Sequence, residues 1–586
     1  MQRRRILVST FLAVALTATA TTSLAANTGG FKTRQPSMLT AVKSGVTVTP
    51  LLTVGDELPS GYTFESIPDG ISVRPSGQRR VDLFVNHETS KVPFPYVTAN
   101  PTTANSESDF DNSQVSQLSL NAAGRVLDGS FVIDSAGGFQ RFCSNYLATS
   151  KEGFDQDIFF TNEESPDYVF RQENSWPPPI GDPAEEENGV VLALDPDTGD
   201  YQTIYGMGRH NHENNVAIPG FDDLVVLSGD DTFTSGPLTI PPGGPNLETS
   251  AASQSQLYSY IASDTDELLD DDGDLWAFVS DDTSFDDYYD FTPGSTQSVS
   301  GHFVQVPKNI ATGKNANGTE IKAADVGFPL PPTDGSWQRD LRSVPPLGID
   351  GPQWVLEYWS QLHNVFDFVR VEDIAYDKRP GMGNVVYVVD SGRGTAGDPQ
   401  AGRSTNGRVW KIVLDPDDPT QVDSLSIVVE GDNNPVKTLG EVHQPDNIET
   451  TKTGLLLTED PGSSQQFPVG STDPNATTAR LWYVPFSGSP QVVVKIDQSA
   501  DGGPTDVGPA PTGNLSIGNW GAWETTGIVD ASAAFGPGAF LINVQAHTLW
   551  VEKAPGPDTF IDANTDPDFT FKREGGQLLL LRIPGI

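Results

Sequence analysis

Short apolar runs that end in acidic, amide or histidine residues recur along this chain. Six of them end at the following residues: Asn86-His87-Glu88, Asn162-Glu163-Glu164, Gly229-Asp230-Asp231, Val389-Asp390, Glu459-Asp460 and Gln545-Ala546-His547. Each is followed, after a spacer of variable length, by a further apolar run such as Arg408 to Leu414. Self-similar units of a few short strands with long variable spacers predict a propeller. We therefore expect an all-β fold, a six-bladed β-propeller with long loop insertions, whose strand-end acids gather at one mouth of the central channel.

Polar motifs also open the repeats. They are Arg141-Phe142-Cys143, Gly208-Arg209-His210-Asn211-His212-Glu213, Arg370-Val371-Glu372, Pro445-Asp446-Asn447 and Trp523-Glu524. Glu is not a favoured turn residue, so turn formation does not explain Glu213, Glu372 and Glu524 together. A propeller would bring these side chains together although more than 200 residues separate some of them.

The N-terminus has the features of a targeting segment. Arg3-Arg4-Arg5 precede an apolar run, Ile6 to Leu16, and Ser23-Leu24-Ala25 supplies a small-residue cleavage site. The basic start fits an ordinary secretion signal and also a loose twin-arginine signal. We expect residues 1–25 to be a signal peptide and the protein to be secreted or periplasmic. No other apolar run of about 20 residues follows, so we expect no transmembrane segment in the mature chain.

Residues 26–586 are predicted to form a single β-propeller domain, because one large propeller can bury an ample core at this length. The region of about 264–360 is rich in acids at its start and in Gly and Pro later. We predict that it is an inserted loop region, since long spacers in propellers often cover the channel mouth.

The balance of charge excludes some partners. Asp and Glu number 78 against 35 Lys and Arg, which gives a formal net charge of -43. Such a chain is not expected to bind nucleic acid or an anionic membrane. Acids clustered at one rim repel one another unless a cation lies among them, so the composition allows divalent cation binding. Cys143 is the only cysteine, which leaves either an inert buried thiol or one that is used chemically.

Taken in order, these motifs resemble those of PhoX-type alkaline phosphatases. The resemblance rests on Asn86-His87-Glu88, Gly-Arg-His-Asn-His-Glu at 208–213, Arg370-Val371-Glu372, Pro445-Asp446-Asn447 and Glu524-Thr525-Thr526-Gly527. Members of that family are six-bladed propellers that bind calcium and iron, hydrolyse phosphate monoesters and are exported by the twin-arginine route. The run after Cys143 and the late Gln545-Ala546-His547-Thr548 differ from the founding phosphatases, which indicates a divergent branch.

The resemblance implies a role for each matched residue. Cys143 is implied to be an iron-binding thiolate, with Glu213 and either Glu164 or its neighbour Glu163 as iron-bound carboxylates. The other implied metal ligands, which include those of calcium, are Glu372, Asp446, Asn447 and Glu524. Arg370 is implied to hold the phosphate, with Glu213 beside it in catalysis. Hard carboxylates suit calcium and ferric iron, and Arg offers a planar fork to phosphate oxygens.

Three functions fit these observations. The first is a secreted, monomeric metal-dependent phosphatase that acts on a small-molecule phosphate ester. The second is a non-catalytic, secreted calcium-binding propeller that serves in adhesion or ligand binding. The third is another hydrolase, such as a lactonase or a phytase-like esterase, although no Gly-x-Ser-x-Gly motif supports a serine nucleophile on an elbow. Iron plus calcium in the purified protein would favour the first function, and calcium alone the second.

Overall fold

A computed structural model of the protein describes residues 29–586 except for 78–79, 91–111, 170, 172–184, 233–254, 334–335, 341–346, 393–405, 433–438, 461–476, 499–522 and 554–571. The predicted signal peptide, residues 1–25, lies outside the described residues. Within them, no helix has the length and apolar character needed to cross a membrane.

Four antiparallel sheets of four or five strands hold much of the described chain. Their strand orders are β3-β4-β5-β6, β12-β11-β8-β7, β1-β27-β26-β25-β24 and β2-β30-β29-β28. The strands are β1 Leu39–Ala41, β2 Thr47–Thr53, β3 Pro68–Pro75, β4 Arg80–His87, β5 Gln114–Asn121, β6 Val126–Ile133, β7 Phe142–Ala148, β8 Ile158–Glu163, β11 Val191–Leu194, β12 Tyr201–Ile204, β24 Pro445–Thr450, β25 Gly454–Glu459, β26 Arg480–Pro485, β27 Gln491–Ile496, β28 Glu524–Asp530, β29 Ala539–Lys553 and β30 Lys572–Arg582. Short apolar runs separated by turns favour such antiparallel pairing.

The largest sheet has nine strands, in the order β13-β14-β15-β16-β17-β23-β22-β21-β20. They are β13 His212–Ile218, β14 Leu224–Asp230, β15 Leu257–Ala262, β16 Asp274–Ser280, β17 Ser298–Gln305, β20 Val371–Tyr376, β21 Val385–Asp390, β22 Arg408–Asp415 and β23 Asp418–Glu430. Its two halves join where β17 pairs with β23, with Ser298 opposite Ser426 and His302 opposite Gln421. The end strands β13 and β20 also contact each other, so this sheet nearly closes on itself.

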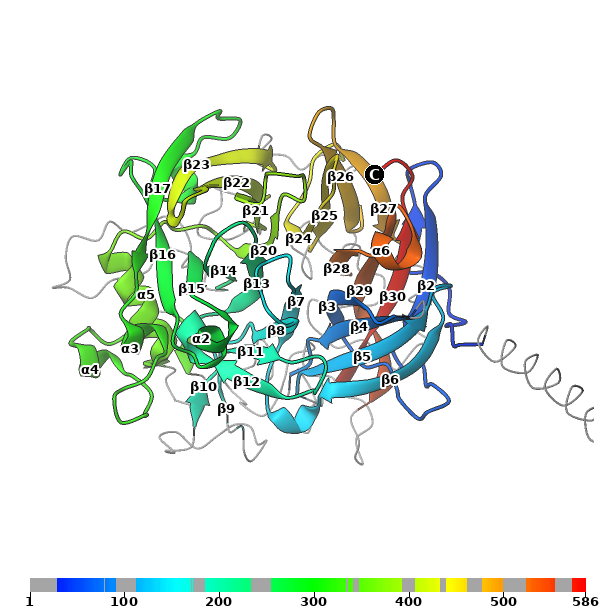
Figure 1. The fold of residues 1–586 in the computed structure, drawn as a ribbon, viewed down its shortest axis with the longest axis horizontal. Helices are drawn as coiled ribbons and strands as arrows, with labels where there is room; N and C mark the ends of the chain where they lie inside the picture. Colours follow the sequence, from blue (N-terminus) through cyan, green and yellow to red (C-terminus); the bar gives the residue numbers. More distant parts are fainter. Residues whose placement is uncertain are drawn as a thin grey trace, which may run out of the picture.

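Six strands form the centre of the molecule. β3, β7, β13, β20, β24 and β28 lie around the middle of the view in Figure 1. Each contacts the next in this order and β28 contacts β3, so together they form a closed ring, which we call the ring strands. Apolar side chains fill the space between neighbouring sheets, as Leu83 and Leu118 do with Leu541 of β29. The protein is therefore mainly β, with a propeller-like arrangement of small sheets and one larger sheet.

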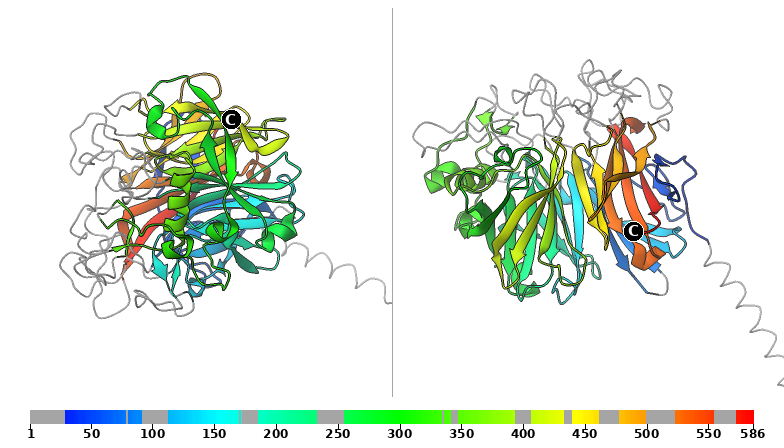
Figure 2. Two further views of the ribbon diagram at one scale, coloured as in Figure 1. Left: turned by 90° about the vertical axis from the view of Figure 1, so that its left-hand side faces the viewer. Right: turned by 90° about the horizontal axis from the view of Figure 1, so that it is seen from above.

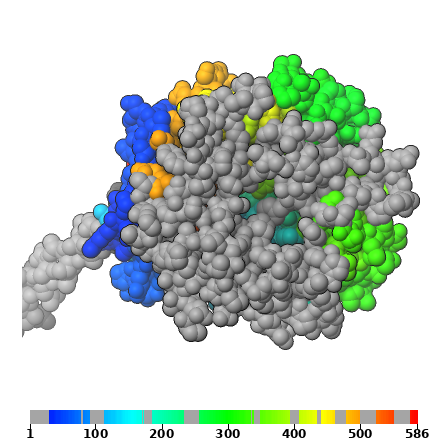
Figure 3. Space-filling view, turned by 180° about the vertical axis from the view of Figure 1, so that it is seen from behind, coloured from blue at the N-terminus to red at the C-terminus, as the bar shows by residue number. Residues whose placement is uncertain are grey.

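The N-terminal strands complete two sheets formed by the C-terminal half of the chain. β1 pairs with β27, and β2 pairs with β30, with Thr47 opposite Arg582. Met38 N–H also donates to Oε1 of Gln577, at 2.9 Å. This N-terminal segment lies on the opposite side of the molecule from the helices near residue 350, as Figures 2 and 3 show.

The region predicted to be an inserted loop, about 264–360, contains regular structure. It contributes β16 and β17 to the nine-stranded sheet, a small pair of strands and four helices. The helices are α2 Thr265–Leu269, α3 Lys308–Ala311, α4 Ala323–Val326 and α5 Pro352–Leu362, and the small strands are β18 Arg339–Asp340 and β19 Leu347–Gly348. α5 starts with Pro352, a residue favoured in the first helical turn. Trp354 and Tyr358 of α5 pack with Trp337 in a separate apolar cluster.

The remaining short elements are the pair β9 Tyr168–Val169 and β10 Glu186–Glu187, the helix α6 Ser532–Phe535, and three 3₁₀ turns. These turns are η1 Ser135–Gly137, η2 Tyr205–Met207 and η3 Tyr288–Asp290.

Candidate metal centre

Five of the six ring strands place a possible metal ligand at the same point. Asp69, Cys143, Glu213, Glu372 and Asp446 are each the second residue of their strand. The register with the neighbouring strand shifts at this point in all five, as between Phe142 and Asn145. An irregularity of this kind redirects side chains out of the regular alternation. In β28 the shift spans Gly527, where a Cβ would lie 2.4 Å from the Asp69 carbonyl oxygen.

The redirected side chains meet in three overlapping groups, which we call the ligand sets. Within each set, the possible ligand atoms all lie within 4.8 Å of one another. The sets are Asp69, Glu88 and Cys143; Cys143, Glu164 and Glu213; and Glu213, Glu372 and Asp446. Cys143 and Glu213 each belong to two sets. The arrangement therefore offers one set made only of carboxylates and two that combine a thiol with carboxylates.

The same backbone hydrogen bond recurs at the residue that directly follows the second strand of a repeat. In five repeats its N–H donates to the carbonyl oxygen two residues before the ring-strand ligand. The pairs are Glu88 to Ile67, Glu164 to Arg141, Asp231 to Asn211, Ser391 to Arg370 and Asp460 to Gln444, with N···O distances of 2.9 to 3.1 Å. Arg141 and Gln444 hold φ angles of +50° and +49°, which residues with a Cβ adopt only when their surroundings enforce it.

Short polar contacts hold the ligands in place. Cys143 Sγ donates to Oδ2 of Asp69 at 3.0 Å, and Ser144 Oγ donates to Oε1 of Glu213 at 2.7 Å. Ser391 Oγ donates to Oε1 of Glu372 at 2.5 Å. The second carboxylate oxygen of Glu213 is buried and accepts no hydrogen bond from the described residues. A buried oxygen in this state costs free energy unless a further group binds it.

Burial and mutual repulsion dominate the electrostatics of the centre. Burial raises the pKa values of Asp69, Glu213, Glu372 and Asp446, and neighbouring carboxylates raise them further. The pKa of Glu88 is raised to about 7 by burial and then by Asp69. Burial, with repulsion from Asp69 and Glu213, also raises the pKa of the Cys143 thiol. Cations would allow these groups to ionise. Carboxylates are ligands for calcium, and a thiolate together with carboxylates suits iron, so the residues present fit those ions.

Arg370 lies beside the all-carboxylate set. Its Nε donates to Oδ1 of Asp231 at 2.8 Å, and a second nitrogen donates to the other oxygen of the same carboxylate. The guanidinium also lies 3.2 Å from Oε1 of Glu372. This two-pronged contact is the kind that Arg also makes with phosphate.

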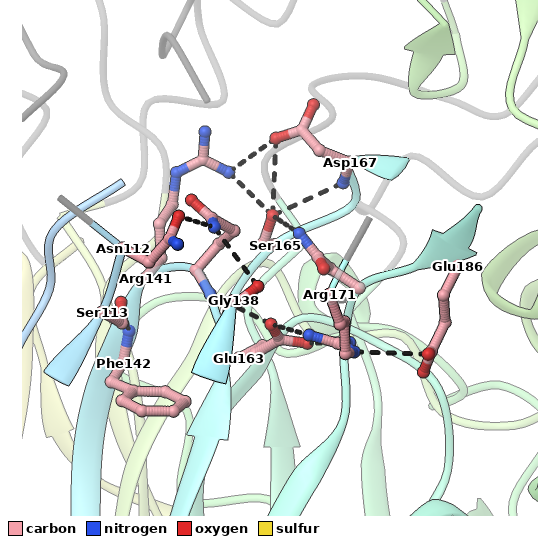
Figure 4. Close-up of polar contacts among 12 residues, drawn as sticks. Asn112, Ser113, Gly138, Arg141, Phe142, Glu163, Ser165, Asp167, Arg171 and Glu186 are labelled. Carbon is pink, nitrogen blue, oxygen red and sulfur yellow. Dashed lines mark hydrogen bonds and ion pairs between the residues drawn. The ribbon is translucent and has the colours of Figure 1, made fainter. Parts of the chain in front are cut away.

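The structure separates the two adjacent glutamates, Glu163 and Glu164. Glu164 joins a ligand set, whereas the Glu163 carboxylate faces Arg171 (Figure 4), with two N–H···O contacts of 2.8 Å. Arg171 Nε lies 3.3 Å from Glu186. Adjacent residues at the end of a strand point to opposite sides. Glu163 therefore belongs to a buried ion pair outside the ligand sets.

Glu524 lies outside the ligand sets, and the Asn447 side chain is engaged by protein groups. The Asn447 side-chain oxygen accepts hydrogen bonds from Thr526 Oγ1, at 2.8 Å, and from the Gly527 backbone. Its Nδ2 donates to Ser144 Oγ at 2.9 Å, so Asn447 links three ring strands. Glu524 lies 3.3 Å from Nε2 of His547, whose Nδ1 contacts Glu574 at 2.8 Å.

Sequence reasoning missed Asp69, and it gave no ligand role to three acids near the centre that it had placed at strand ends: Glu88, Asp231 and Asp460. A signal for each was present. Asp69 follows a proline as Asp446 does, and the other three end apolar runs as Glu164 does. Alignment of the repeats on the ring-strand ligand, in addition to the apolar runs, would have found Asp69.

We expect the stability of the metal-free protein to fall as pH rises. An acid whose pKa is higher in the folded state than in the unfolded state, near 4, binds its proton more tightly when folded. Stability is then lost as pH rises from that value through the folded pKa, which is about 7 for Glu88. Melting in chelator should thus occur at a lower temperature at pH 8 than at pH 5. Calcium should reverse this difference, and Glu88→Gln should reduce it. If the melting temperature changes equally between pH 5 and pH 8 with and without calcium, the result would contradict a metal centre.

Comparison with known proteins assigns the chain to no family. No family model and no curated protein matches it. Three solved structures are similar over much of the chain. A computationally designed protein, Ika8, is 8% identical, with 89% of this chain and 97% of that chain covered and a TM-score of 0.26. A sialidase of Trypanosoma rangeli, solved with 2,3-difluorosialic acid, is 9% identical, with 92% of this chain and 60% of that chain covered and a TM-score of 0.30. Drosophila plexin A, solved with semaphorin 1b, is 8% identical, with 73% of this chain and 85% of that chain covered and a TM-score of 0.21.

Proposed function

We propose that this protein is a metal-dependent phosphatase that hydrolyses phosphate monoesters at a centre of calcium and iron, as a divergent relative of the PhoX-type alkaline phosphatases. The observation that carries the proposal is the overlap of three ligand sets around Cys143 and Glu213, with Arg370 alongside. We also propose that the ring is a six-bladed propeller. Each ring strand starts a group of four or five strands, and the β17–β23 pairing joins a group of five and a group of four into the nine-stranded sheet.

The ligand sets differ in the ions they suit. The set of Cys143, Glu164 and Glu213 combines a soft thiolate with hard carboxylates, which suits iron. The set of Glu213, Glu372 and Asp446 contains only carboxylates, which suits calcium. When bound, such ions hold a phosphoryl group and make a bound oxygen a better nucleophile.

Arg370 would bind the phosphate of the substrate. The bidentate contact that its guanidinium makes with Asp231 fixes the orientation of the fork, which supports this role. A phosphate would compete with Asp231 for this fork. A guanidinium already in place stabilises the charge that grows on the phosphoryl oxygens as the ester bond breaks. Export through the N-terminal segment and a monomeric state remain predictions.

The test combines metal analysis with turnover of a chromogenic aryl phosphate. We expect the purified protein to contain iron and calcium and to lose its phosphatase activity in a chelator. Cys143→Ser should lose iron and activity together, because Cys143 belongs to both thiol-containing sets. It should keep calcium, since the set of Glu213, Glu372 and Asp446 does not include the thiol.

Two outcomes would contradict the proposal. Iron and activity that survive in Cys143→Ser would leave the cysteine as a packing residue. A metal-loaded protein without turnover on aryl, sugar and nucleotide phosphates would favour a calcium-binding module without catalysis.

A further inference from the structure

A cavity of about 190 Å³ lies along the six ring strands. The ligand-set residues are the second residues of five of these strands, whereas the cavity is lined by later residues. Examples from successive ring strands are Val73, Leu147, Val216, Tyr376, Glu449 and Val529. No residue of the ligand sets lines it. The distal cavity, as we call it, therefore lies further along the ring strands than the ligand sets do.

Part of the wall of this cavity is apolar. Ile71, Ile374 and Ile448 each come two residues after a ring-strand ligand, and all three line the distal cavity. Ile528 of β28 lines it too. These side chains give the cavity an apolar wall, as small-molecule sites commonly have.

Two carboxylates of the distal cavity are already held by protein groups. Oε1 of Glu152 accepts from Tyr376 Oη at 2.7 Å, and its Oε2 accepts from Thr149 Oγ1 at 2.9 Å. Glu449 accepts from Lys378 Nζ at 2.5 Å and from the Asp530 N–H at 2.7 Å. Oε2 of Glu152 also accepts from the Thr149 backbone N–H at 2.9 Å. Oε1 of Glu152 and both oxygens of Glu449 can each accept a second hydrogen bond, and the Lys378 ammonium has further N–H groups to donate. These groups are fixed in position and can still form hydrogen bonds to a ligand.

The inner wall adds amides and a hydroxyl. Ser72 Oγ donates to Asn145 Oδ1 at 2.6 Å, which leaves the Ser72 oxygen able to accept. Asn214 Nδ2 donates to Asp373 at 2.5 Å, and its amide has a second N–H. Both oxygens of Asp373 already accept bonds, from Asn214, from the Ile374 N–H and from the Ile448 N–H. The cavity thus presents both donors and acceptors.

Charge and size narrow the class of ligand. The lining lysines, Lys151 and Lys378, are balanced by Glu152 and Glu449, and Asp373 adds an acid, so the cavity does not favour an anion. A hydroxyl group both donates and accepts, which matches a wall of mixed donors and acceptors. The volume of about 190 Å³ is below the ~300–1,000 Å³ of sites for drug-sized molecules. We propose that the distal cavity binds a small neutral polyol, the size of a single sugar ring, independently of the metal centre.

Calorimetric titration of the full chain tests this proposal. The probes are D-glucose, D-galactose, D-mannose and myo-inositol, with D-gluconate as the anionic comparison. We expect at least one neutral probe to bind with Kd of about 1 mM or tighter, with equal affinity in calcium and in chelator. Tyr376→Phe should weaken the binding of that probe about tenfold, because the hydroxyl that orients Glu152 is lost.

A blocking variant and its control locate the binding. Val73→Trp places an indole at the lining of the cavity and should abolish binding without changing the metal content. Val428→Trp, at a residue that is 43% exposed on β23 and outside the cavity, should leave binding unchanged. Three results would overturn the proposal: no neutral probe binds, only D-gluconate binds, or binding survives in Val73→Trp. None of them bears on the phosphatase assay, so the two proposals can fail separately.

Discussion

Glu213→Gln is expected to lose iron and calcium together and to lower the rate of phosphate ester hydrolysis by at least about 10²-fold. Glu213 is the one glutamate shared by two ligand sets among the described residues, and one of its buried oxygens has no hydrogen-bond donor there. The amide keeps the size of the side chain but removes the negative charge that a cation needs. Metal analysis and the rate with an aryl phosphate measure both effects.

The loss should not come from unfolding. Glu213 is a buried carboxylate with a raised pKa and is repelled by Glu372, so in chelator at pH 8 the amide should raise the melting temperature. Glu357→Gln is the matched control. Glu357 is also buried, its pKa is raised to about 8 by burial, and it accepts from Gln256 and Gln361 outside the ligand sets. The control should keep metal and activity. Equal loss in both variants would show that any buried carboxylate has this effect.

Arg370→Ala should lower the hydrolysis rate by about 10²- to 10³-fold, the effect of removing one positioned group that stabilises developing charge. Arg370→Lys keeps the charge but not the planar fork, so its rate should fall between those of the wild type and Arg370→Ala. The rates should be measured at saturating substrate with metal content checked in each variant. Arg370→Ala also leaves the Asp231 carboxylate without its guanidinium partner, and removal of one partner of a buried pair costs about 3–5 kcal/mol.

A control arginine separates the loss of function from the loss of stability. Arg379 pairs with Asp377 and is 34% exposed, so Arg379→Ala should keep the full rate. Asp231→Asn frees the Arg370 fork from its carboxylate and should tighten the binding of inorganic phosphate. Full activity in both Arg370 variants would exclude Arg370 as the phosphate-binding group.

The sequence indicates which residues lie at the strand ends of this site more clearly than it indicates the direction in which their side chains point. Cys143, Glu213, Glu372 and Asp446 are predicted as ligands because each opens a repeat, and the ring places them in overlapping ligand sets. The choice between Glu163 and Glu164 could not be made, because neighbouring strand residues alternate in direction and a shift of one residue reverses both. Asp69 was hidden because Pro68-Asp69-Gly70 has the composition of a turn.

Long-range pairing was the part of the fold that the sequence did not show. The nine-stranded sheet depends on the register between β17 and β23, which are more than 100 residues apart. β1 has only three residues, and its pairing with β27 gives no local pattern. Such contacts are decided by packing between distant segments rather than by local preference.

The pairing of β2 with β30 has a consequence for the synthesis of the chain. β2 is made early, at residues 47–53, but its partner β30 lies at residues 572–582. The sheet that contains both strands therefore cannot be completed until residues 572–582 have been synthesised. A chain released before residue 572 would lack β30, and β2 and β29 would then expose unpaired strand edges. Exposed edges of this kind are sites of aggregation. Premature termination near the C-terminus should therefore yield insoluble protein rather than a slightly shortened ring.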